Sequence, residues 1–279
     1  MTRDELIEHI ERHPVEGSPE EMRAAFRGLS ACAWEGMPAG QPLRLAGLDT
    51  ALFGSASRGT ILHFHGGGFV FGDLDTHRGL AHLLSELTGW RVVLAHLPPA
   101  PETPYRDQLS AALALFGELC SGPGHLVLSG DSAGGFAAID VALARPGKAE
   151  ALLTFSPNIA RNYELTPSRF AHSEADAMAS HEDDHALAAM AFGKIDPADP
   201  DQNLQLRDLS SLPRTFVSVG TDEVLLDDAL LFCREAAHQG VSLRLETHPG
   251  FHLEELFAPI FTPGRRRLQR ASAFLATSA

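Results

Sequence analysis

Short apolar runs alternate with helical stretches over most of this chain, and that alternation constrains its fold more than any other feature. Three stretches with helical spacing of apolar residues cover 103–120, 133–144 and 223–240. Around them lie seven runs that we expect to be strands: 50–55, 60–65, 91–97, 125–130, 151–157, 215–220 and 243–250. Strands that alternate with helices in this way predict βαβ units and a mainly parallel, buried sheet flanked by helices, which is the α/β class.

Two regions fall outside the alternation. The first, residues 1–45, is helical and contains a capping box in which Ser18 precedes Pro19 and Glu21 follows three residues after the serine. The second, residues 159–206, is rich in Ala, His, Asp and Pro and has no strand signal. We expect both regions to form a helical cap on one domain spanning 1–279, whose α/β core covers 46–158 and 207–279.

The charge of the chain argues against nucleic acid as a partner. The formal net charge of the 279 residues is -14, whereas nucleic-acid binding needs a concentrated basic face. One basic cluster, made of Arg265, Arg266, Arg267 and Arg270, lies in a predicted C-terminal helix. We interpret it as a solvated helix face.

Cysteine usage and the N-terminus favour a cytoplasmic protein. Cys32, Cys120 and Cys233 are odd in number and far apart, so a disulfide framework or a thiolate zinc site is not expected. The charged N-terminus lacks the apolar stretch of a signal peptide, and no run approaches the roughly 18 apolar residues of a membrane span. We therefore expect a soluble protein without a membrane partner, which could form a homodimer.

The motif most indicative of chemistry is G-x-S-x-G at 130–134, where an apolar strand is followed directly by a predicted helix. This strand–turn–helix context is the one in which the central serine of such a motif acts as a nucleophile. Ser132 would then project its hydroxyl above the sheet, toward the free N–H groups at the start of the new helix. A tight turn that merely contains a serine is the alternative, so the choice depends on a base and an acid.

An acid and then a base follow Ser132, which is the order that a hydrolytic triad of this kind requires. Asp222 comes just after the strand at 215–220, and His252 comes just after the last strand. Glu223, Asp227 and Asp228 are alternative acids, of which the last two fall inside a helix and are expected to be structural or at the surface. His248 is the alternative base.

Together these motifs make the chain resemble the hormone-sensitive-lipase-like (bacterial family IV) esterases, which have the α/β-hydrolase fold. The resemblance extends from about residue 60 to the C-terminus and is carried by HGGGF at 65–69, APE at 100–102, GDSAGG at 130–135, GTDEVLLDDA at 220–229 and His252. It implies an oxyanion hole formed by the backbone N–H groups of Gly67, Gly68 and Ala133. Side chains at the two glycines would block the approaching carbonyl, and His65 would anchor the loop by hydrogen bonding.

The chain departs from this family pattern in two places. Before APE, Pro98 and Pro99 replace an Arg-Leu pair, so an arginine that would normally help to fix the loop is missing. Around His252 the chain reads GFHLEEL, one residue shorter than usual before the histidine, with Glu254 and Glu255 after it. Either the histidine has shifted slightly, or the rim of the active site is more acidic than usual.

Two further motifs are not assigned to binding. His181, Glu182 and His185 form H-E-x-x-H, but no third metal ligand follows at the usual spacing, and Ser180 and Asp183 predict a capped, acidic surface helix instead. The glycine run lacks both the dinucleotide fingerprint and the end of a P-loop. We expect neither a metal nor an organic cofactor.

The predicted activity is hydrolysis of carboxylic esters of small to medium size through Ser132, His252 and Asp222 and an acyl-enzyme. A lactone or an N-acetyl amide is an alternative substrate for the same triad. A catalytically inactive homologue that binds a small molecule is the alternative outside enzymology.

Overall fold

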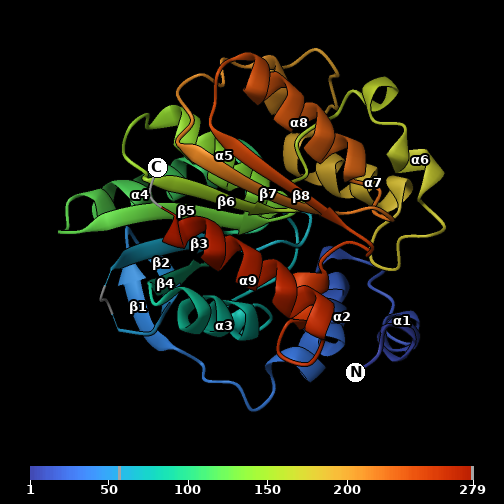
Figure 1. The fold of residues 1–279 in the computed structure, drawn as a ribbon. Helices are drawn as coiled ribbons and strands as arrows, with labels where there is room; N and C mark the ends of the chain where they lie inside the picture. The colour runs from blue at the N-terminus through green and yellow to red at the C-terminus, as the bar shows by residue number, and fades with distance from the viewer. Residues whose placement is uncertain (56–57, 278–279) are drawn as a thin grey trace.

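An eight-stranded, mainly parallel sheet forms the centre of the protein in the computed structural model, which describes residues 1–55 and 58–277 (Figure 1). The remaining residues, 56–57 and 278–279, belong to the predicted core and lie outside the described residues. The strand order is β1-β2-β4-β3-β5-β6-β7-β8. The strands are β1 (Gln41–Leu45), β2 (Leu48–Phe53), β3 (Gly59–Phe64), β4 (Arg91–Ala95), β5 (His125–Asp131), β6 (Ala151–Phe155), β7 (Arg214–Gly220) and β8 (Leu243–His248).

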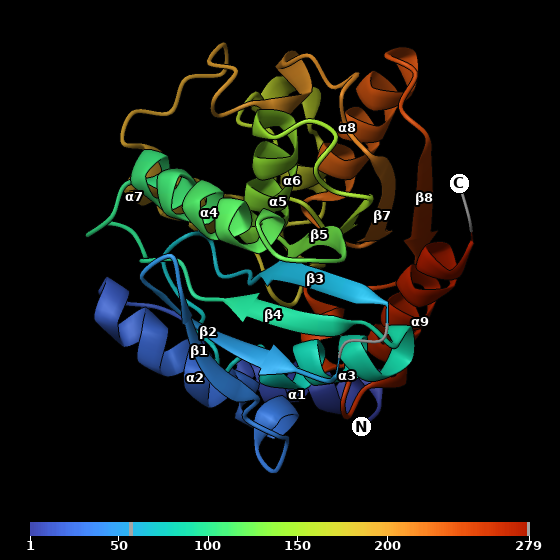
Figure 2. The same cartoon turned by 90° about the vertical axis from the view of Figure 1, so that its left-hand side faces the viewer.

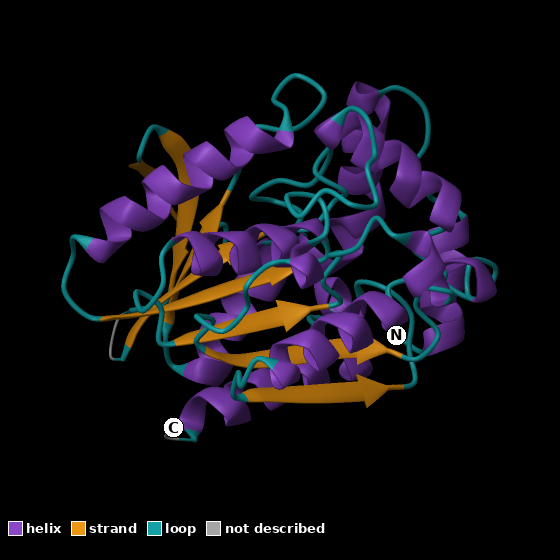
Figure 3. Ribbon diagram, turned by 90° about the horizontal axis from the view of Figure 1, so that it is seen from above, coloured by secondary structure: helices purple, strands orange, loops and turns teal. Residues whose placement is uncertain are grey.

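The six neighbouring strands β4, β3, β5, β6, β7 and β8 pair in parallel. By contrast, β2 is antiparallel to β4, and β1 is antiparallel to β2. This arrangement confirms the α/β class predicted from the alternation. The sequence prediction did not include β1, which belongs to the sheet although it falls within the region 1–45 expected in the cap. Seen from above, the arrowheads of the parallel strands point to the side of the molecule that holds the N-terminus (Figure 3).

Helices cover both faces of the sheet (Figures 1 and 2). On one face lie α4 (Tyr105–Cys120), α5 (Ala133–Ala144) and α8 (Leu226–His238). On the other face α3 (Arg78–Thr88) packs against α9 (Thr262–Ala276). With both faces covered, the central strands are buried on both sides, which explains their nearly continuous apolar sequences.

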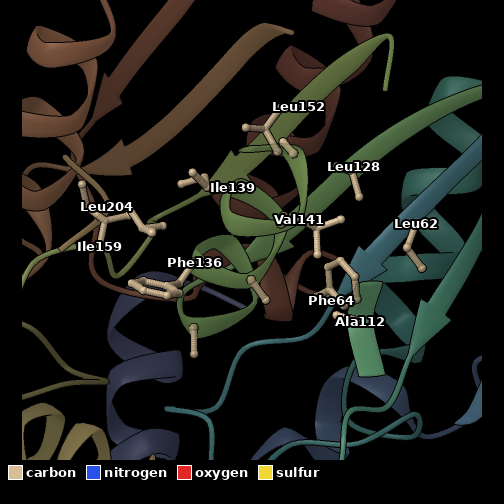
Figure 4. Packing of buried hydrophobic residues seen from close by; sticks show 14 of the residues in the cluster. Leu62, Phe64, Ala112, Leu128, Phe136, Ile139, Val141, Leu152, Ile159 and Leu204 are labelled. Atoms are coloured by element: carbon tan, nitrogen blue, oxygen red, sulfur yellow. The ribbon is translucent and has the colours of Figure 1, made fainter. Parts of the chain in front are cut away.

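Helix α5 lies at the middle of the larger apolar cluster (Figure 4). Its Phe136, Ile139 and Val141 side chains are fully buried against residues of the sheet such as Leu128 and Leu152. This packing fixes the helix that begins immediately after Ser132, and thereby fixes the position of the serine.

The N-terminal helices α1 (Arg3–Glu11) and α2 (Pro19–Trp34) pack on the segment that carries His252. Leu6, Ile10 and Phe26 join Phe251 and Phe257 in a separate buried cluster. The capping box predicted at Ser18 and Glu21 is present at the start of α2. These helices therefore support one side of the site.

The region from 159 to 206 contains no strand, as predicted, and includes the short α6 (Ser168–Ala171) and the longer α7 (His181–Phe192). Helix α6 lies against α8, and α7 lies against α4. Among the described residues, no helix is both long and apolar enough to cross a bilayer.

Candidate active site

Ser132 occupies a sharp turn between β5 and α5. Its φ and ψ are 51° and -121°, a conformation that costs an L-residue energy and that persists only where the surroundings enforce it. The turn requires glycine on both sides, because a Cβ at Gly130 would lie 2.2 Å from the carbonyl oxygen of Gly134, and one at Gly134 would lie 2.0 Å from that of Phe64. The local sequence thus forces Ser132 out of the strand and onto the first turn of a helix.

The imidazole of His252 faces this serine. Ser132 Oγ and His252 Nε2 lie 2.9 Å apart, within hydrogen-bond distance, and both residues are buried. The rival His248 ends β8, and its Nε2 has no hydrogen-bond partner in the described part of the chain. The structure therefore brings the predicted serine and the predicted histidine together.

The carboxylate beside this histidine is that of Glu223 and not that of Asp222, which corrects the residue predicted from sequence. Glu223 Oε2 lies 3.2 Å from His252 Nδ1. Asp222 Oδ2 instead pairs with Arg3 at 2.6 Å, at the surface. Because the two acids are consecutive in a turn, their side chains diverge, and only Glu223 turns inward. Both acids directly follow the same strand, so their position in the sequence could not separate them.

Three donors hold the second oxygen of Glu223, Oε1. It accepts hydrogen bonds from the backbone N–H of Gly220 at 2.6 Å, the Ser156 hydroxyl at 2.8 Å and the Arg267 guanidinium at 3.1 Å. With Oε1 occupied, Oε2 is left to face the imidazole. The acid is therefore oriented by hydrogen bonds from the protein itself.

Arg267 lies at the centre of a buried cluster of charges, contrary to the interpretation of the basic cluster as a wholly solvated face. It is 2% exposed and, besides Glu223, pairs with Glu254 at 3.3 Å and Glu255 at 2.9 Å. Arg265, Arg266 and Arg270 are exposed. The two glutamates after His252 are 1% and 0% exposed, so they are partners of Arg267 rather than an acidic rim.

These contacts determine the ionisation of the site. Burial by itself lowers the pKa of His252, but the hydrogen bond and charge of Glu223, together with the charges of Asp176 and Glu255, raise it to about 9. For Glu223, burial acts to raise the pKa, but the hydrogen bond to His252 and the charge of Arg267 lower it below its ordinary value. The pair thus favours imidazolium beside carboxylate, which is the state that forms when a serine proton is taken up.

The glycine loop contributes Gly67 and Gly68 to the cavity that Ser132 and His252 also line. Gly67 and Gly68 have φ of 119° and 58°, which favour glycine. A Cβ at Gly67 would lie 2.1 Å from the carbonyl oxygen of Phe71, and one at Gly68 would lie 2.5 Å from a Leu187 methyl group. Neighbouring protein atoms thus require glycine at both positions, which is a steric reason besides the approach of a substrate carbonyl that we expected side chains to block.

Three amides beside the serine are free to bind an anion. No hydrogen bond among the described residues uses the N–H groups of Gly67, Gly68 or Ala133. Gly67 and Gly68 line the same cavity as Ser132, and Ala133 begins α5 directly after the serine. Unpaired N–H groups in such a place are suited to stabilise negative charge.

Buried side chains anchor the first part of the loop. Asp131 accepts hydrogen bonds from the backbone N–H of Gly66 at 3.0 Å, from His63 at 3.0 Å and from His77 at 3.2 Å. His65 bonds the Gly66 carbonyl at 2.8 Å and lies 3.2 Å from His96, so it holds the loop as expected. Burial lowers the pKa of His65 to about 3, which keeps it neutral.

Arg23 of α2 provides an arginine where the segment before APE lacks one. It donates hydrogen bonds to the carbonyl oxygens of Val70 at 2.9 Å and Ala100 at 2.8 Å and pairs with Glu102 at 2.5 Å. The glycine loop and the APE segment are therefore joined by a side chain from the N-terminal helices. Sequence reasoning missed this residue because its position in the chain is remote from both.

A cavity of about 320 Å³ opens onto Ser132 and His252. Its walls come from both predicted cap regions and from the glycine loop. The apolar residues on these walls include Ile10, Val15, Met22, Phe26, Leu29, Phe71, Met178 and Leu187. The size and the lining are those of a small-molecule site, with Ser132 and His252 in its wall.

The H-E-x-x-H segment forms the first turns of α7. Ser180 caps this helix through the N–H of Asp183, as predicted, and His185 Nδ1 lies 3.1 Å from the Tyr163 hydroxyl. Among the residues described here, no group of three or more His, Cys, Asp or Glu side chains is arranged to hold a metal ion.

Comparison with known proteins agrees with this fold. The profile of a family described as having the alpha/beta hydrolase fold matches residues 61–253. An acetyl-hydrolase of Streptomyces hygroscopicus is 30% identical, over 98% of this chain and 95% of its own length. An esterase of Acinetobacter venetianus is 31% identical, over 75% of this chain and 72% of its own.

A crystal structure of an esterase from the bacterial hormone-sensitive lipase family superposes with a TM-score of 0.88 at 26% identity, covering 99% of this chain and 98% of that one. The chain belongs to the alpha/beta hydrolase family, among the hormone-sensitive-lipase-like esterases. It is an enzyme of the carboxylic-ester hydrolase class.

Proposed function

We propose that this enzyme hydrolyses carboxylic esters with small to medium acyl groups through a triad of Ser132, His252 and Glu223. The observation that carries the proposal is one continuous path of contacts: Ser132 Oγ to His252 Nε2 at 2.9 Å, and His252 Nδ1 to Glu223 Oε2 at 3.2 Å. A hydroxyl, an imidazole and a carboxylate so connected are the groups that nucleophilic acyl transfer requires.

In the first half of the reaction, Ser132 Oγ attacks the ester carbonyl while His252 Nε2 takes the hydroxyl proton. Glu223 accepts a hydrogen bond from the Nδ1–H of His252 and stabilises the imidazolium that forms. The tetrahedral intermediate collapses as His252 returns the proton to the leaving alcohol, and the acyl group stays on Ser132. In the second half, water attacks this acyl-enzyme while His252 Nε2 takes its proton. His252 then gives that proton to Ser132 Oγ as the bond to the acyl group breaks, and the carboxylic acid leaves.

Negative charge develops on the carbonyl oxygen in both halves. We propose that the N–H groups of Gly67, Gly68 and Ala133 bind this oxygen. Each such donor contributes on the order of 3 kcal/mol to the stabilisation of the transition state. The fixed glycine loop supports this role, because its donors need no rearrangement when the charge appears.

We further propose that residues 1–40 and 159–206 act as the cap, which shapes the substrate cavity. Both contribute to the walls, through Ile10 and Leu29 from one side and Met178 and Leu187 from the other. A cavity of about 320 Å³ with a mainly apolar lining favours a short or medium acyl chain over a long one. The relationship to an acetyl-hydrolase points the same way.

Labelling with a fluorophosphonate tests the nucleophile. Mass spectrometry of the adduct should place the phosphonyl group on Ser132, and Ser132→Ala should abolish both labelling and turnover of p-nitrophenyl acetate and butyrate. Labelling of another residue, or an active Ser132→Ala variant, would contradict the proposal. A folded wild-type protein that neither labels nor turns over either ester would favour a binding protein.

A further inference from the structure

The cap region at 159–206 reaches the triad itself through one buried carboxylate, that of Asp176. This residue lies between α6 and α7, is 7% exposed and also lines the substrate cavity. Its contacts extend to both loops that carry triad residues. It therefore has a place in the site that the reaction steps do not explain.

The two oxygens of Asp176 accept three backbone N–H groups. Oδ1 accepts from His252 at 3.1 Å and from Met178 at 3.1 Å, and Oδ2 accepts from Val224 at 3.0 Å. His252 is the proposed base, and Val224 directly follows the proposed acid, Glu223. One carboxylate thus bridges the main chains of the base and the acid, which come from different loops.

Neighbouring residues of the same region add to this attachment. His172 Nδ1 donates to the Glu223 carbonyl oxygen at 3.0 Å, and the Ser168 hydroxyl donates to the Val224 carbonyl oxygen at 2.9 Å. The acid loop is therefore bound to the cap region on both its N–H and its carbonyl side. The loop that carries His252 is bound to the same cap region through the hydrogen bond from the His252 backbone N–H to Asp176.

We propose that Asp176 is a positioning residue for the triad, whose carboxylate holds the main chains of His252 and Val224 in register so that the imidazole meets Glu223. This inference rests on the proposed function. Because Ala177 and Met178 next to it also line the cavity, a segment that lines the substrate cavity is also the one that sets the triad geometry. A displacement of the catalytic side chains by about 1 Å reduces turnover by up to about a hundredfold.

The charge of Asp176 also acts on the base. Burial raises the pKa of Asp176 to about 6, with a smaller opposing effect of the His252 charge, so the carboxylate is ionised at neutral pH. The negative groups that face His252 are Glu223, Asp176 and Glu255. Removing the charge of Asp176 leaves the other two, and therefore lowers the pKa of His252 without returning it to that of an isolated imidazole.

Two substitutions separate position from charge. Asp176→Asn removes the charge and puts an N–H₂ group against a backbone N–H, whereas Asp176→Glu keeps the charge but displaces it by one methylene. Glu174→Gln is the matched control, since Glu174 is exposed and lies two residues away in the same segment. Activity is measured with p-nitrophenyl butyrate from pH 6 to 10, and thermal unfolding is followed for every variant.

Asp176→Asn should lower kcat about tenfold or more, with a smaller change in KM, and should move the acid limb of kcat/KM to lower pH. Asp176→Glu should keep the limb in place but not recover kcat, and Glu174→Gln should match wild type. The inference fails if Asp176→Asn or Asp176→Glu keeps kcat within about twofold, or if the loss only follows the folded fraction.

A measurement on the wild-type protein covers variants that do not fold. Amide hydrogen exchange of His252, Val224 and Met178 should be about a hundredfold or more slower than that of exposed loop amides. Rapid exchange of the His252 or Val224 amide would overturn the inference. If the wild type has no esterase activity, the proposed function fails, while this exchange experiment still decides whether Asp176 holds the two loops.

Discussion

Glu223 Oε2 lies 3.2 Å from His252 Nδ1, although the residue just before it in the chain is also an acid. The neighbour, Asp222, lies at the surface in an ion pair with Arg3. The inward acid is surrounded by Gly220, Ser156 and Arg267, which together bind its other oxygen. The two carboxylates therefore differ in environment far more than in sequence position.

This difference predicts opposite outcomes for two amide substitutions. Glu223→Gln should lower kcat by about three to four orders of magnitude, because an amide does not stabilise the imidazolium or fix its tautomer. Asp222→Asn removes a surface ion pair, costs less than about 1 kcal/mol of stability and should leave kcat/KM nearly unchanged. Steady-state kinetics on p-nitrophenyl butyrate measures both. A strongly impaired Asp222→Asn would show that the acid was assigned incorrectly.

The two candidate bases can be separated in the same way. His252→Ala should lose about a thousandfold or more in kcat, since no other imidazole in the described part of the chain is hydrogen-bonded to Ser132. His248→Ala should keep most of the activity, with thermal unfolding used to confirm that both variants fold. If His248→Ala alone abolished turnover, the base would have to be reassigned.

The pH dependence follows from the raised pKa of His252. The enzyme needs neutral imidazole as its base, so kcat/KM should keep rising with pH above the ordinary histidine range, toward about pH 9. In Glu223→Gln the residual activity should show this limb at lower pH, because the charge that stabilises imidazolium is gone. A wild-type limb near pH 6.5 would contradict the assigned electrostatics.

The same shift has a consequence for folding. Because the pKa of His252 is raised in the folded state, its contribution to the free energy of unfolding is fully present below about pH 6.5 and is lost as the pH rises through about 9. The melting temperature should therefore decline over this range. Its decline should be shallower in His252→Ala.

Arg267 should contribute to the free energy of unfolding. Arg267→Met leaves Glu223, Glu254 and Glu255 without their shared cation, and breaking a buried pair in this way costs about 3–5 kcal/mol. Arg270→Met, an exposed position on the same helix, is the control and should change stability by less than about 1 kcal/mol. Denaturant unfolding gives both values, and equal effects would contradict the structural role of the buried arginine.

Arg23 links α2 to the glycine loop that we propose binds the oxyanion, so Arg23→Met should lower kcat about tenfold while binding of substrate changes less. The expected loss in stability is about 1 kcal/mol, since the bonds lie partly in solvent. Exposed Arg106→Met serves as the control for removal of a positive charge. Unchanged kcat in Arg23→Met would show that the loop holds its shape without α2.

Several elements of this protein could be predicted from the sequence because the signals are local. Alternating strands and helices determined the sheet, and the glycines around Ser132 determined the sharp turn that places it between β5 and α5. The capping box at Ser18 and Glu21 determined where α2 begins. Each depends on residues within a few positions of one another, so propensity and steric limits are sufficient.

The choice of acid, the burial of Arg267 and the contacts of Asp176 and Arg23 were decided only by the tertiary structure. Arg267 and Asp176 reach partners about 40 to 80 positions away, and the sequence does not show which side of a turn will face the interior. Asp222 and Glu223 have the same charge and adjacent positions, so no local rule separates them. The sequence thus determined the chemistry available near Ser132, and packing between distant segments decided which groups are desolvated and paired there, because a buried charge is stable only where its partners already lie.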